Sequence, residues 1–133
     1  MKPSALPATA SLRIRRAYDP PTPADGCRVL VDRLWPRGLK RESAGVDHWL
    51  RELAPSNELR QWFGHDPERW DEFRRRYADE LQTPAAAAAL AELRGLIAAH
   101  PVLTLVYGAR ETTHNNAEAL RLWLEGEAGP GGP

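Results

Sequence analysis

Polar and charged side chains follow two apolar runs of this sequence, and their types suit anion binding and proton transfer. If the two runs form neighbouring parallel strands, their carboxyl ends meet at one edge of the sheet, where such sheets bind ligands. The first set follows residues 29–31 and comprises Asp32, Arg33, Trp35, Arg37 and Gly38. The second set ends and follows residues 102–107 and comprises Tyr107, Gly108, Arg110, Glu111, Thr112, Thr113, His114, Asn115 and Asn116. The sequence therefore predicts one candidate site built from both sets.

The predicted ligand of this site is an anionic small molecule, with phosphorylated compounds included. A guanidinium such as that of Arg37 can bind phosphate or carboxylate through two parallel hydrogen bonds. Backbone N–H groups around residues 113–116, at the start of a predicted helix, add a second place for an anion. The predicted ligand-binding residues are Arg33, Arg37, Gly38, Tyr107, Arg110, Glu111, Asn115 and Asn116.

The predicted catalytic residues are Asp32 and His114. The imidazole of His114 titrates near neutral pH and lies beside Glu111 and Asn115 in the sequence, while Asp32 could act as a base. Hydrolysis and group transfer both fit such a site. The carboxylates lack the spacing of a metal site, so no metal is predicted, and the sequence names no cofactor.

Structural roles compete with these functional ones. Asp32 and Arg33 could pair with neighbouring side chains, and Thr112 or Thr113 could cap the last helix. His65 and Asp66 resemble a catalytic pair, but adjacent side chains point apart, and Asp66 before Pro67 is typical of a helix N-cap. The aromatic residues of the helical stripes are expected to pack in the core.

The order of predicted elements favours an α/β fold, a single small domain with a mostly parallel sheet flanked by helices. Alternating apolar residues predict a strand from Leu12, and apolar runs predict interior strands at 27–34 and 102–107. A loop or single helical turn is expected at 19–26, and a helical crossover with helices on both faces of the sheet follows from the long connection between the interior strands. The short first connection leaves an antiparallel link open.

Periodicity and capping residues predict the individual helices. Apolar residues at 46, 49, 50 and 53 have helical spacing. Ser56 is a candidate N-cap of a short helix that stops at Gly64, and Thr83 with Pro84 starts an alanine-rich helix. The last helix is expected to bury residues 117, 120, 123 and 124.

Four segments together resemble a known family: VLVDRLWPRGL, DHWLRELAPSNELRQWF, HDPERWDEFRRRYADEL and LTLVYGARETTHNNA. They are similar to the YeaO-like branch of domain-of-unknown-function family 488, from Leu12 to about Leu124. The resemblance implies an α/β domain in which Asp32 and Arg33 end one strand and a polar loop, residues 107–116, follows the last strand. Other branches carry cysteines in or near that loop, and this chain has none there. The resemblance therefore implies no thiolate or cysteine–metal chemistry for this chain.

Composition limits the class of protein. The 133 residues carry 18 Lys and Arg against 18 Asp and Glu, so no net positive charge attracts nucleic acid. The single cysteine, Cys27, cannot form an internal disulfide and is expected to be buried. No apolar run is long enough to span a membrane and no signal pattern is present, which predicts a cytoplasmic protein. The predicted organisation is a flexible arm at 1–11, one α/β domain at 12–124 and a flexible Gly/Pro tail at 125–133.

A nonenzymatic module that binds nucleic acid or a protein partner is the alternative function. Basic residues cluster in the N-terminal segment and again after the second strand, and they could follow a phosphate backbone. These residues are Lys2, Arg13, Arg15, Arg16, Arg37, Lys40 and Arg41.

Overall fold

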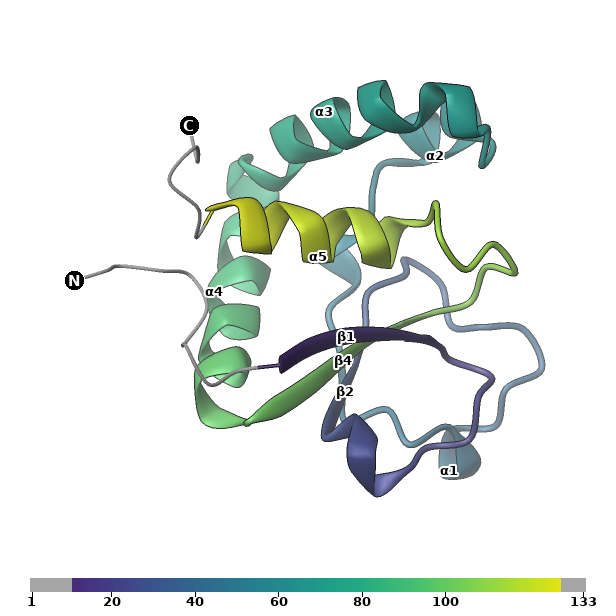
Figure 1. Cartoon of the computed structure of the whole chain (residues 1–133), viewed down its shortest axis with the longest axis vertical. Coiled ribbons are helices and arrows are strands. Elements are labelled where there is room, and N and C mark those ends of the chain that lie inside the picture. The colour runs from purple at the N-terminus through teal and green to yellow at the C-terminus, as the bar shows by residue number, and fades with distance from the viewer. Residues whose placement is uncertain (1–10, 128–133) are drawn as a thin grey trace.

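The computed structural model describes residues 11–127, in which parallel strands form a sheet with most of the helices on one side (Figure 1). The strands are β1 (Ser11–Arg16), β2 (Cys27–Leu30), β3 (His48–Trp49) and β4 (Val102–Tyr107). Their order across the sheet is β1-β4-β2-β3, and every neighbouring pair is parallel. The predicted α/β fold is confirmed. The antiparallel alternative is wrong, because β1 and β2 both pair in parallel with β4, which lies between them.

The helices begin largely where capping residues predict. Ser56 Oγ accepts a hydrogen bond from the Leu59 N–H, and the Asp66 carboxylate accepts one from the Glu68 N–H. Within residues 11–127, no helix is both long and apolar enough to cross a bilayer. The helices are α1 (Arg41–Ala44), α2 (Asn57–Phe63), α3 (Trp70–Leu81), α4 (Pro84–Ala99) and α5 (Asn116–Glu127), with single 3-10 turns at Pro23–Asp25, Arg51–Leu53 and Pro67–Arg69.

The two faces of the sheet are covered differently. Val29 and Val31 point into the main core, which contains buried residues of α2 to α5, whereas Leu30 and Val106 belong to a second apolar cluster on the opposite face. Partly buried side chains of β3 and of the connecting segments pack on that second cluster, namely Trp35, Leu39, Val46 and Trp49. Helices therefore lie on both faces, as expected, but unequally: α2 to α5 contribute to the main core, and the short helix α1, whose Ala44 carbonyl accepts from Arg28 Nη2, lies with the connecting segments on the second face (Figure 1).

The helix predicted from Val46 to Leu53 is replaced by β3 and a single 3-10 turn. Two residues of β3 pair with β2, and the Leu50 N–H donates to the Leu30 carbonyl at 2.9 Å. Val46 packs in the second cluster, while Leu50 and Leu53 belong to the main core. The helical spacing misled the prediction because this segment passes the sheet edge and buries side chains on both faces, which one helix stripe cannot do.

Element boundaries differ modestly from those expected. β1 begins at Ser11, a residue predicted to belong to the N-terminal arm, and α5 continues to Glu127, beyond the predicted domain end at Leu124. β2 ends at Leu30, so Leu34 leaves the sheet and is 74% exposed. The predictions of a flexible arm and tail otherwise concern residues 1–10 and 128–133, which lie outside the described residues. Cys27 is buried, as expected.

Gly26 ends the connection between β1 and β2, and both its backbone conformation and its close approach to β4 require a glycine. Its φ is +63°, and a Cβ built there would lie 2.1 Å from the Val102 carbonyl oxygen. We expect Gly26→Ala to lower the free energy of unfolding by about 1 to 3 kcal/mol, because it adds left-handed strain and forces β4 to move. Thermal denaturation measures the change. Gly95→Ala in α4 is the control: no atom lies within 4 Å of its added Cβ, so equal destabilisation by both variants would contradict the argument.

Candidate functional site

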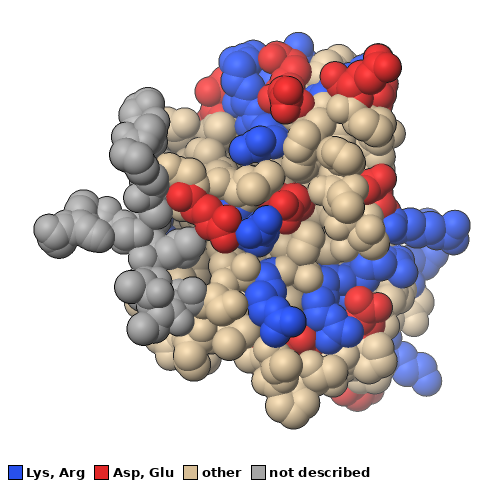
Figure 2. Space-filling model, in the orientation of Figure 1, with Lys and Arg blue, Asp and Glu red and all other residues tan. Residues whose placement is uncertain are grey.

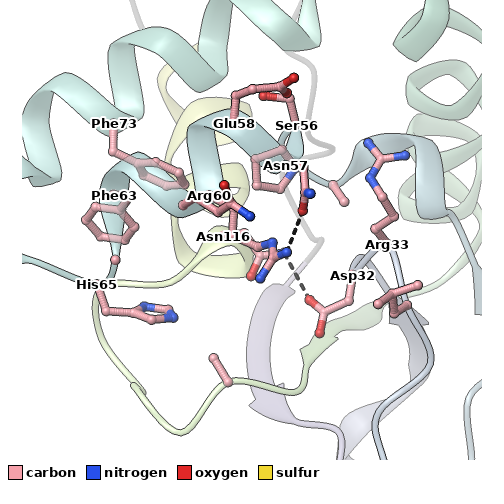
Figure 3. Close-up of a pocket in the computed structure, with 16 residues that line it drawn as sticks. Asp32, Arg33, Ser56, Asn57, Glu58, Arg60, Phe63, His65, Phe73 and Asn116 are labelled. Carbon is pink, nitrogen blue, oxygen red and sulfur yellow. Dashed lines mark hydrogen bonds between the residues drawn. The ribbon is translucent and has the colours of Figure 1, made fainter.

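A pocket of about 970 Å³ lies beyond the carboxyl ends of β2 and β4 (Figure 3). It is bounded by residues that follow the two strands, by α2 and its flanking loops, and by single residues of α3 and α5. Because β2 and β4 are adjacent and parallel, the residues that follow them meet at one cavity, as the sequence predicts for the two strand ends. The lining residues are Asp32, Arg33, Leu34, Ala54, Pro55, Ser56, Asn57, Glu58, Arg60, Gln61, Phe63, Gly64, His65, Phe73, Ala109 and Asn116.

Asp32 and Asn116 form what we call the floor of the pocket, next to the strand ends. Asp32 Oδ2 accepts a hydrogen bond from the Gly108 N–H at 2.8 Å, and its Oδ1 accepts one from Asn116 Nδ2 at 3.1 Å. Burial raises the pKa of the Asp32 carboxyl above its ordinary value. The two hydrogen bonds and the charges of Arg60 and His65 lower it without cancelling the effect of burial. The hydrogen bonds and nearby charges therefore do not fully offset the cost of burying the ionised Asp32 carboxylate.

Two guanidinium groups line the same pocket. Arg60, on α2, donates to the Asn57 side-chain oxygen at 2.5 Å, and Arg33 makes no hydrogen bond or ion pair within residues 11–127. No carboxylate of the described residues lies within 4.0 Å of either guanidinium. Both side chains are exposed at the pocket, so they are available to an anion from solvent.

His65 contributes an imidazole to the pocket wall. Its Nδ1 lies 3.1 Å from the backbone carbonyl oxygen of His114, and a carbonyl oxygen can only accept, so Nδ1 carries a proton. In the neutral ring Nε2 is then an acceptor. Figure 3 shows the ring extending into the pocket below Phe63. His65 has a φ of +57°, which reflects the tight turn between α2 and the next helical segment.

An aromatic wall closes one side of the pocket. Phe63 from α2 and Phe73 from α3 stack with their ring centroids 4.2 Å apart and an interplanar angle of 16°. Both residues also belong to the main core, where Phe73 stacks with Trp70 and Tyr77. The wall is therefore held by the packing of α2 against α3 and does not depend on a ligand.

Two of the N–H groups predicted to bind an anion before α5 are already occupied. Glu111 Oε2 accepts hydrogen bonds from the N–H groups of Thr113 and His114 and from the Thr113 hydroxyl. These bonds, led by that of the Thr113 side chain, lower the pKa of Glu111 to about 2. The loop thus supplies its own anion. Asn115, rather than Thr112 or Thr113, caps α5, since its side-chain oxygen accepts from the Glu118 N–H at 2.9 Å.

Of the predicted site residues, the structure brings Asp32, Arg33 and Asn116 into the pocket. The other predicted residues do not line it. Tyr107 and Asn115 are buried in the fold, and the His114 ring packs edge-on against Trp70 with centroids 5.0 Å apart. Those not lining the pocket are Arg37, Gly38, Tyr107, Arg110, Glu111, His114 and Asn115.

Sequence reasoning missed the part of the pocket formed by residues 54–65. The sequence predicts a short helix here, from Ser56 as N-cap to the stop at Gly64, and assigns no site role to its polar residues, while its aromatic residues are expected in the core. The contacts of α2 with α3, and of α3 with α5, place this segment over the strand ends. One signal was available: the sequence singles out His65 with Asp66 as a possible catalytic pair, and His65, but not Asp66, lines the pocket. Among residues 11–127, no three His, Cys, Asp or Glu side chains gather in a way that could hold a metal.

A small parallel α/β domain with a ligand-sized pocket at its strand ends is the class of protein that these features define. Residues 11–129 match the family model described as the inactive DUF488-N3 subclade, so the chain belongs to the DUF488-N3i family. The resemblance to the YeaO-like branch of family 488 is thereby confirmed.

This chain aligns with nearly the whole length of its relatives. The chain is 43% identical to the uncharacterized protein Rv3073c of Mycobacterium tuberculosis over 115 residues, which is 86% of this chain and 94% of that protein. It is 42% identical to the uncharacterized protein YeaO of Escherichia coli over 115 residues, 86% of this chain and 96% of YeaO. No solved structure matches the chain. These matches establish the family, and they carry no biochemical activity with them.

Proposed function

We propose that this protein binds an anionic small molecule in the pocket at the ends of β2 and β4. The observation that carries the proposal is the pair of guanidinium groups, Arg33 and Arg60, that line the pocket without a carboxylate within 4.0 Å in the described part of the chain. A guanidinium fork matches the oxygens of phosphate and carboxylate and binds them with charge-assisted hydrogen bonds. Phosphate esters and carboxylates are therefore the expected ligand classes.

The form of the pocket supports a ligand with an apolar or ring-shaped part. Its volume of about 970 Å³ lies within the range of small-molecule sites. Phe63 and Phe73 line one side of the pocket and are themselves buried, whereas Leu34, which also lines it, is 74% exposed. A ligand that covers Leu34 would gain about 25 cal/mol for each Å² of apolar surface removed from water.

Binding without catalysis is the form of the proposal that we favour. The family model is described as inactive, and His114, the predicted proton-transfer partner of Asp32, packs against Trp70 outside the pocket. Catalysis by Asp32 and His114, as a hydrolase or transferase, stays a prediction that a product assay would test. Cytoplasmic localisation likewise stays a prediction from the sequence.

The nucleic-acid alternative has less support in the structure. Arg15 binds the Asp25 carboxylate, Arg16 donates to the carbonyls of Gly108 and Ala109, and Arg13 donates to the Ala24 carbonyl. On the face drawn in Figure 2, basic and acidic side chains are interspersed. The basic residues of β1 are thus engaged within the fold, whereas the two arginines of the pocket have no carboxylate within 4.0 Å among the described residues.

Removal of the Arg60 charge should abolish anion binding. In a thermal-shift screen against phosphate, sulfate, nucleotides and sugar phosphates, a ligand at about 100 times its dissociation constant adds roughly 2.7 kcal/mol and raises the midpoint by several degrees. We expect Arg60→Gln to lose this shift. Arg37→Gln is the matched control, because Arg37 is also an exposed arginine but lies outside the pocket. A shift that survives in Arg60→Gln, or that only Arg37→Gln removes, would contradict the proposal.

A further inference from the structure

The floor of the pocket presents hydrogen-bond acceptors without donors to fill them. A carboxylate has about four acceptor positions, and Asp32 uses one on each oxygen, toward the Gly108 N–H and Asn116 Nδ2. Within residues 11–127 no cationic nitrogen lies within 4.0 Å of this carboxylate. Arg60 and His65 act on it only through longer-range charge. Each Asp32 oxygen therefore has a lone pair that no described group occupies.

Asn116 adds an acceptor to the same cavity. Asn116 Nδ2 donates to both the Val31 carbonyl and Asp32 Oδ1, each at 3.1 Å, which uses both of its N–H bonds and fixes the orientation of the amide. Its side-chain oxygen accepts no hydrogen bond from the described residues. A ligand would therefore need hydrogen-bond donors to bind the floor and hydrogen-bond acceptors to bind Arg33 and Arg60.

We infer that the ligand carries a protonated amine in addition to its anionic group, and that this ammonium binds the Asp32 carboxylate. The expected class is that of amino compounds that bear a phosphate or carboxylate, such as amino sugar phosphates and phosphorylated amino acids. This inference rests on the proposed function, because it assumes that Arg33 and Arg60 hold the anionic end of the same molecule. A primary ammonium supplies three N–H donors, which suits a floor with several acceptors and no cation.

The electrostatics of Asp32 agree with this assignment. Burial raises the pKa of its carboxyl in the free protein, so ionisation is costly there. An ammonium against the carboxylate would lower that cost through a charge-assisted hydrogen bond, and it would add the ion-pair partner that the fold lacks. A neutral hydroxyl in the same place offers one donor and no charge. The structure therefore favours an amine over an alcohol at the floor.

Matched ligand pairs test the inference on the unmodified protein. Glucosamine 6-phosphate differs from glucose 6-phosphate, and O-phosphoserine from 3-phosphoglycerate, by an ammonium in place of a hydroxyl. Calorimetric titration near neutral pH should show the amine of at least one pair binding about 10-fold tighter or better, as expected for a hydrogen bond to a charged group. Equal affinities within each pair would overturn the inference.

Two variants separate the inference from the proposed function. Asp32→Asn should remove most of the advantage of the amine while the hydroxyl compound still binds, and Arg60→Gln should weaken both members of a pair. Thermal midpoints show whether Asp32→Asn remains folded, and the wild-type comparison stands without it. Binding that depends on Arg60 but shows no preference for the amine would overturn this inference alone. Binding that ignores Arg60, or the absence of binding by all four compounds, would overturn the proposed function as well.

Discussion

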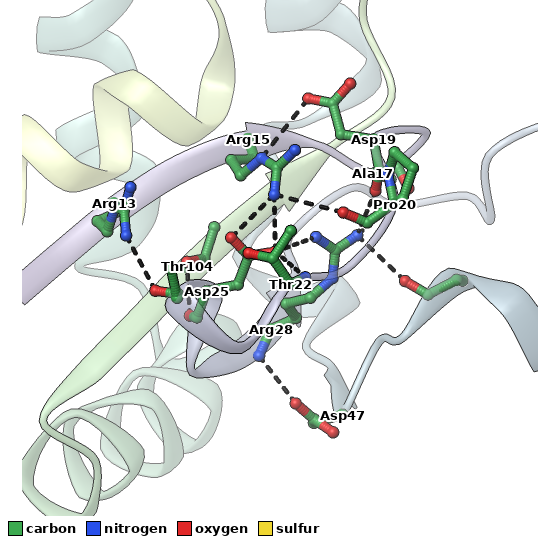
Figure 4. A network of polar contacts seen from close by, with 12 residues as sticks. Arg13, Arg15, Ala17, Asp19, Pro20, Thr22, Asp25, Arg28, Asp47 and Thr104 are labelled. Atoms are coloured by element: carbon green, nitrogen blue, oxygen red, sulfur yellow. Dashed lines mark hydrogen bonds and ion pairs between the residues drawn. The ribbon is translucent and has the colours of Figure 1, made fainter.

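Asp25→Asn should lower the free energy of unfolding by about 3 to 5 kcal/mol, because it leaves a buried guanidinium without its counterion. Asp25 and Arg28 are both almost fully buried, and Arg28 Nη1 donates to Asp25 Oδ2 at 2.8 Å. Arg15 Nη1 donates to both Asp25 oxygens at 2.9 Å, and the Thr22 N–H donates to Oδ2 at 3.1 Å. The carboxylate is therefore the acceptor on which two arginines and a turn converge (Figure 4).

Among residues 11–127, Asp25 is the only carboxylate within 4.0 Å of the Arg28 guanidinium. Its Nη2 donates to backbone carbonyls of Ala17, Asp19 and Ala44, at 3.4, 3.2 and 3.1 Å, and its Nε has no partner within the described residues. These carbonyls belong to the first connection and to α1. The side chain thus joins β2 to the segments that cover the second face of the sheet, and loss of its counterion should loosen both.

Chemical denaturation at neutral pH measures this effect, and Asp19→Asn is the matched control. Asp19 belongs to the same connection and forms an ion pair with Arg15 at 3.7 Å, but its side chain is 45% exposed. Exposed ion pairs contribute about 0 to 1 kcal/mol, so the control should unfold close to wild type. If Asp25→Asn were as mild as Asp19→Asn, the buried pair would not hold the first connection in place.

The same carboxylate predicts how stability depends on pH. Burial raises the pKa of Asp25, but hydrogen bonds from Arg15, the Thr22 N–H and Arg28 outweigh burial and hold it at about 2, below its ordinary 3.8. A group whose pKa is lower in the folded state stabilises the fold above its unfolded pKa. This contribution, about 2 kcal/mol, is therefore full above pH 4 and is lost as the pH falls toward about 2. Asp25→Asn should show a flatter stability profile over that range.

The sequence predicted most helices and strands, but it did not predict which of their side chains are buried or what those side chains contact. Caps such as Ser56 and Asp66 and the apolar run of β4 specify local structure, and the structure confirms them. The ion pair of Arg28 had no such signal, because its burial depends on the path of the connection before β2, and that path depends on Asp25. The helix predicted at 46–53 failed for a related reason: its apolar residues divide between two clusters on opposite faces of the sheet.

The candidate site was predictable only where strand ends define it. Asp32 and Asn116 reach the pocket because parallel strands place their carboxyl ends together, which a βαβ pattern implies. Arg60 and His65 reach it because α2 packs on α3, a tertiary contact that no local pattern contains. The polar loop after β4 was predicted to bind an anion because its N–H groups precede a helix. Two of these N–H groups donate instead to Glu111, a carboxylate of the same loop.

Phe73→Ala should lower the free energy of unfolding by about 3 to 5 kcal/mol, as expected for truncation of a fully buried aromatic residue. Phe73 is 1% exposed and stacks with Phe63, Trp70 and Tyr77. Its ring joins α3 to α2, so the variant should also lose the aromatic wall of the pocket. Chemical denaturation and the ligand screen together measure both consequences.

Phe73→Leu separates packing from ligand contact. Leucine keeps much of the apolar volume, so the variant should lose less stability than Phe73→Ala, in line with the milder cost of substitutions that largely conserve volume. It nevertheless removes one of the two aromatic rings that line this side of the pocket. If the pocket binds a ring-shaped ligand against this wall, Phe73→Leu should weaken binding more than its modest loss of stability explains. Unchanged affinity in a folded Phe73→Leu protein would mean that the ligand is held by Arg33, Arg60 and the floor alone, and that the aromatic wall serves the core.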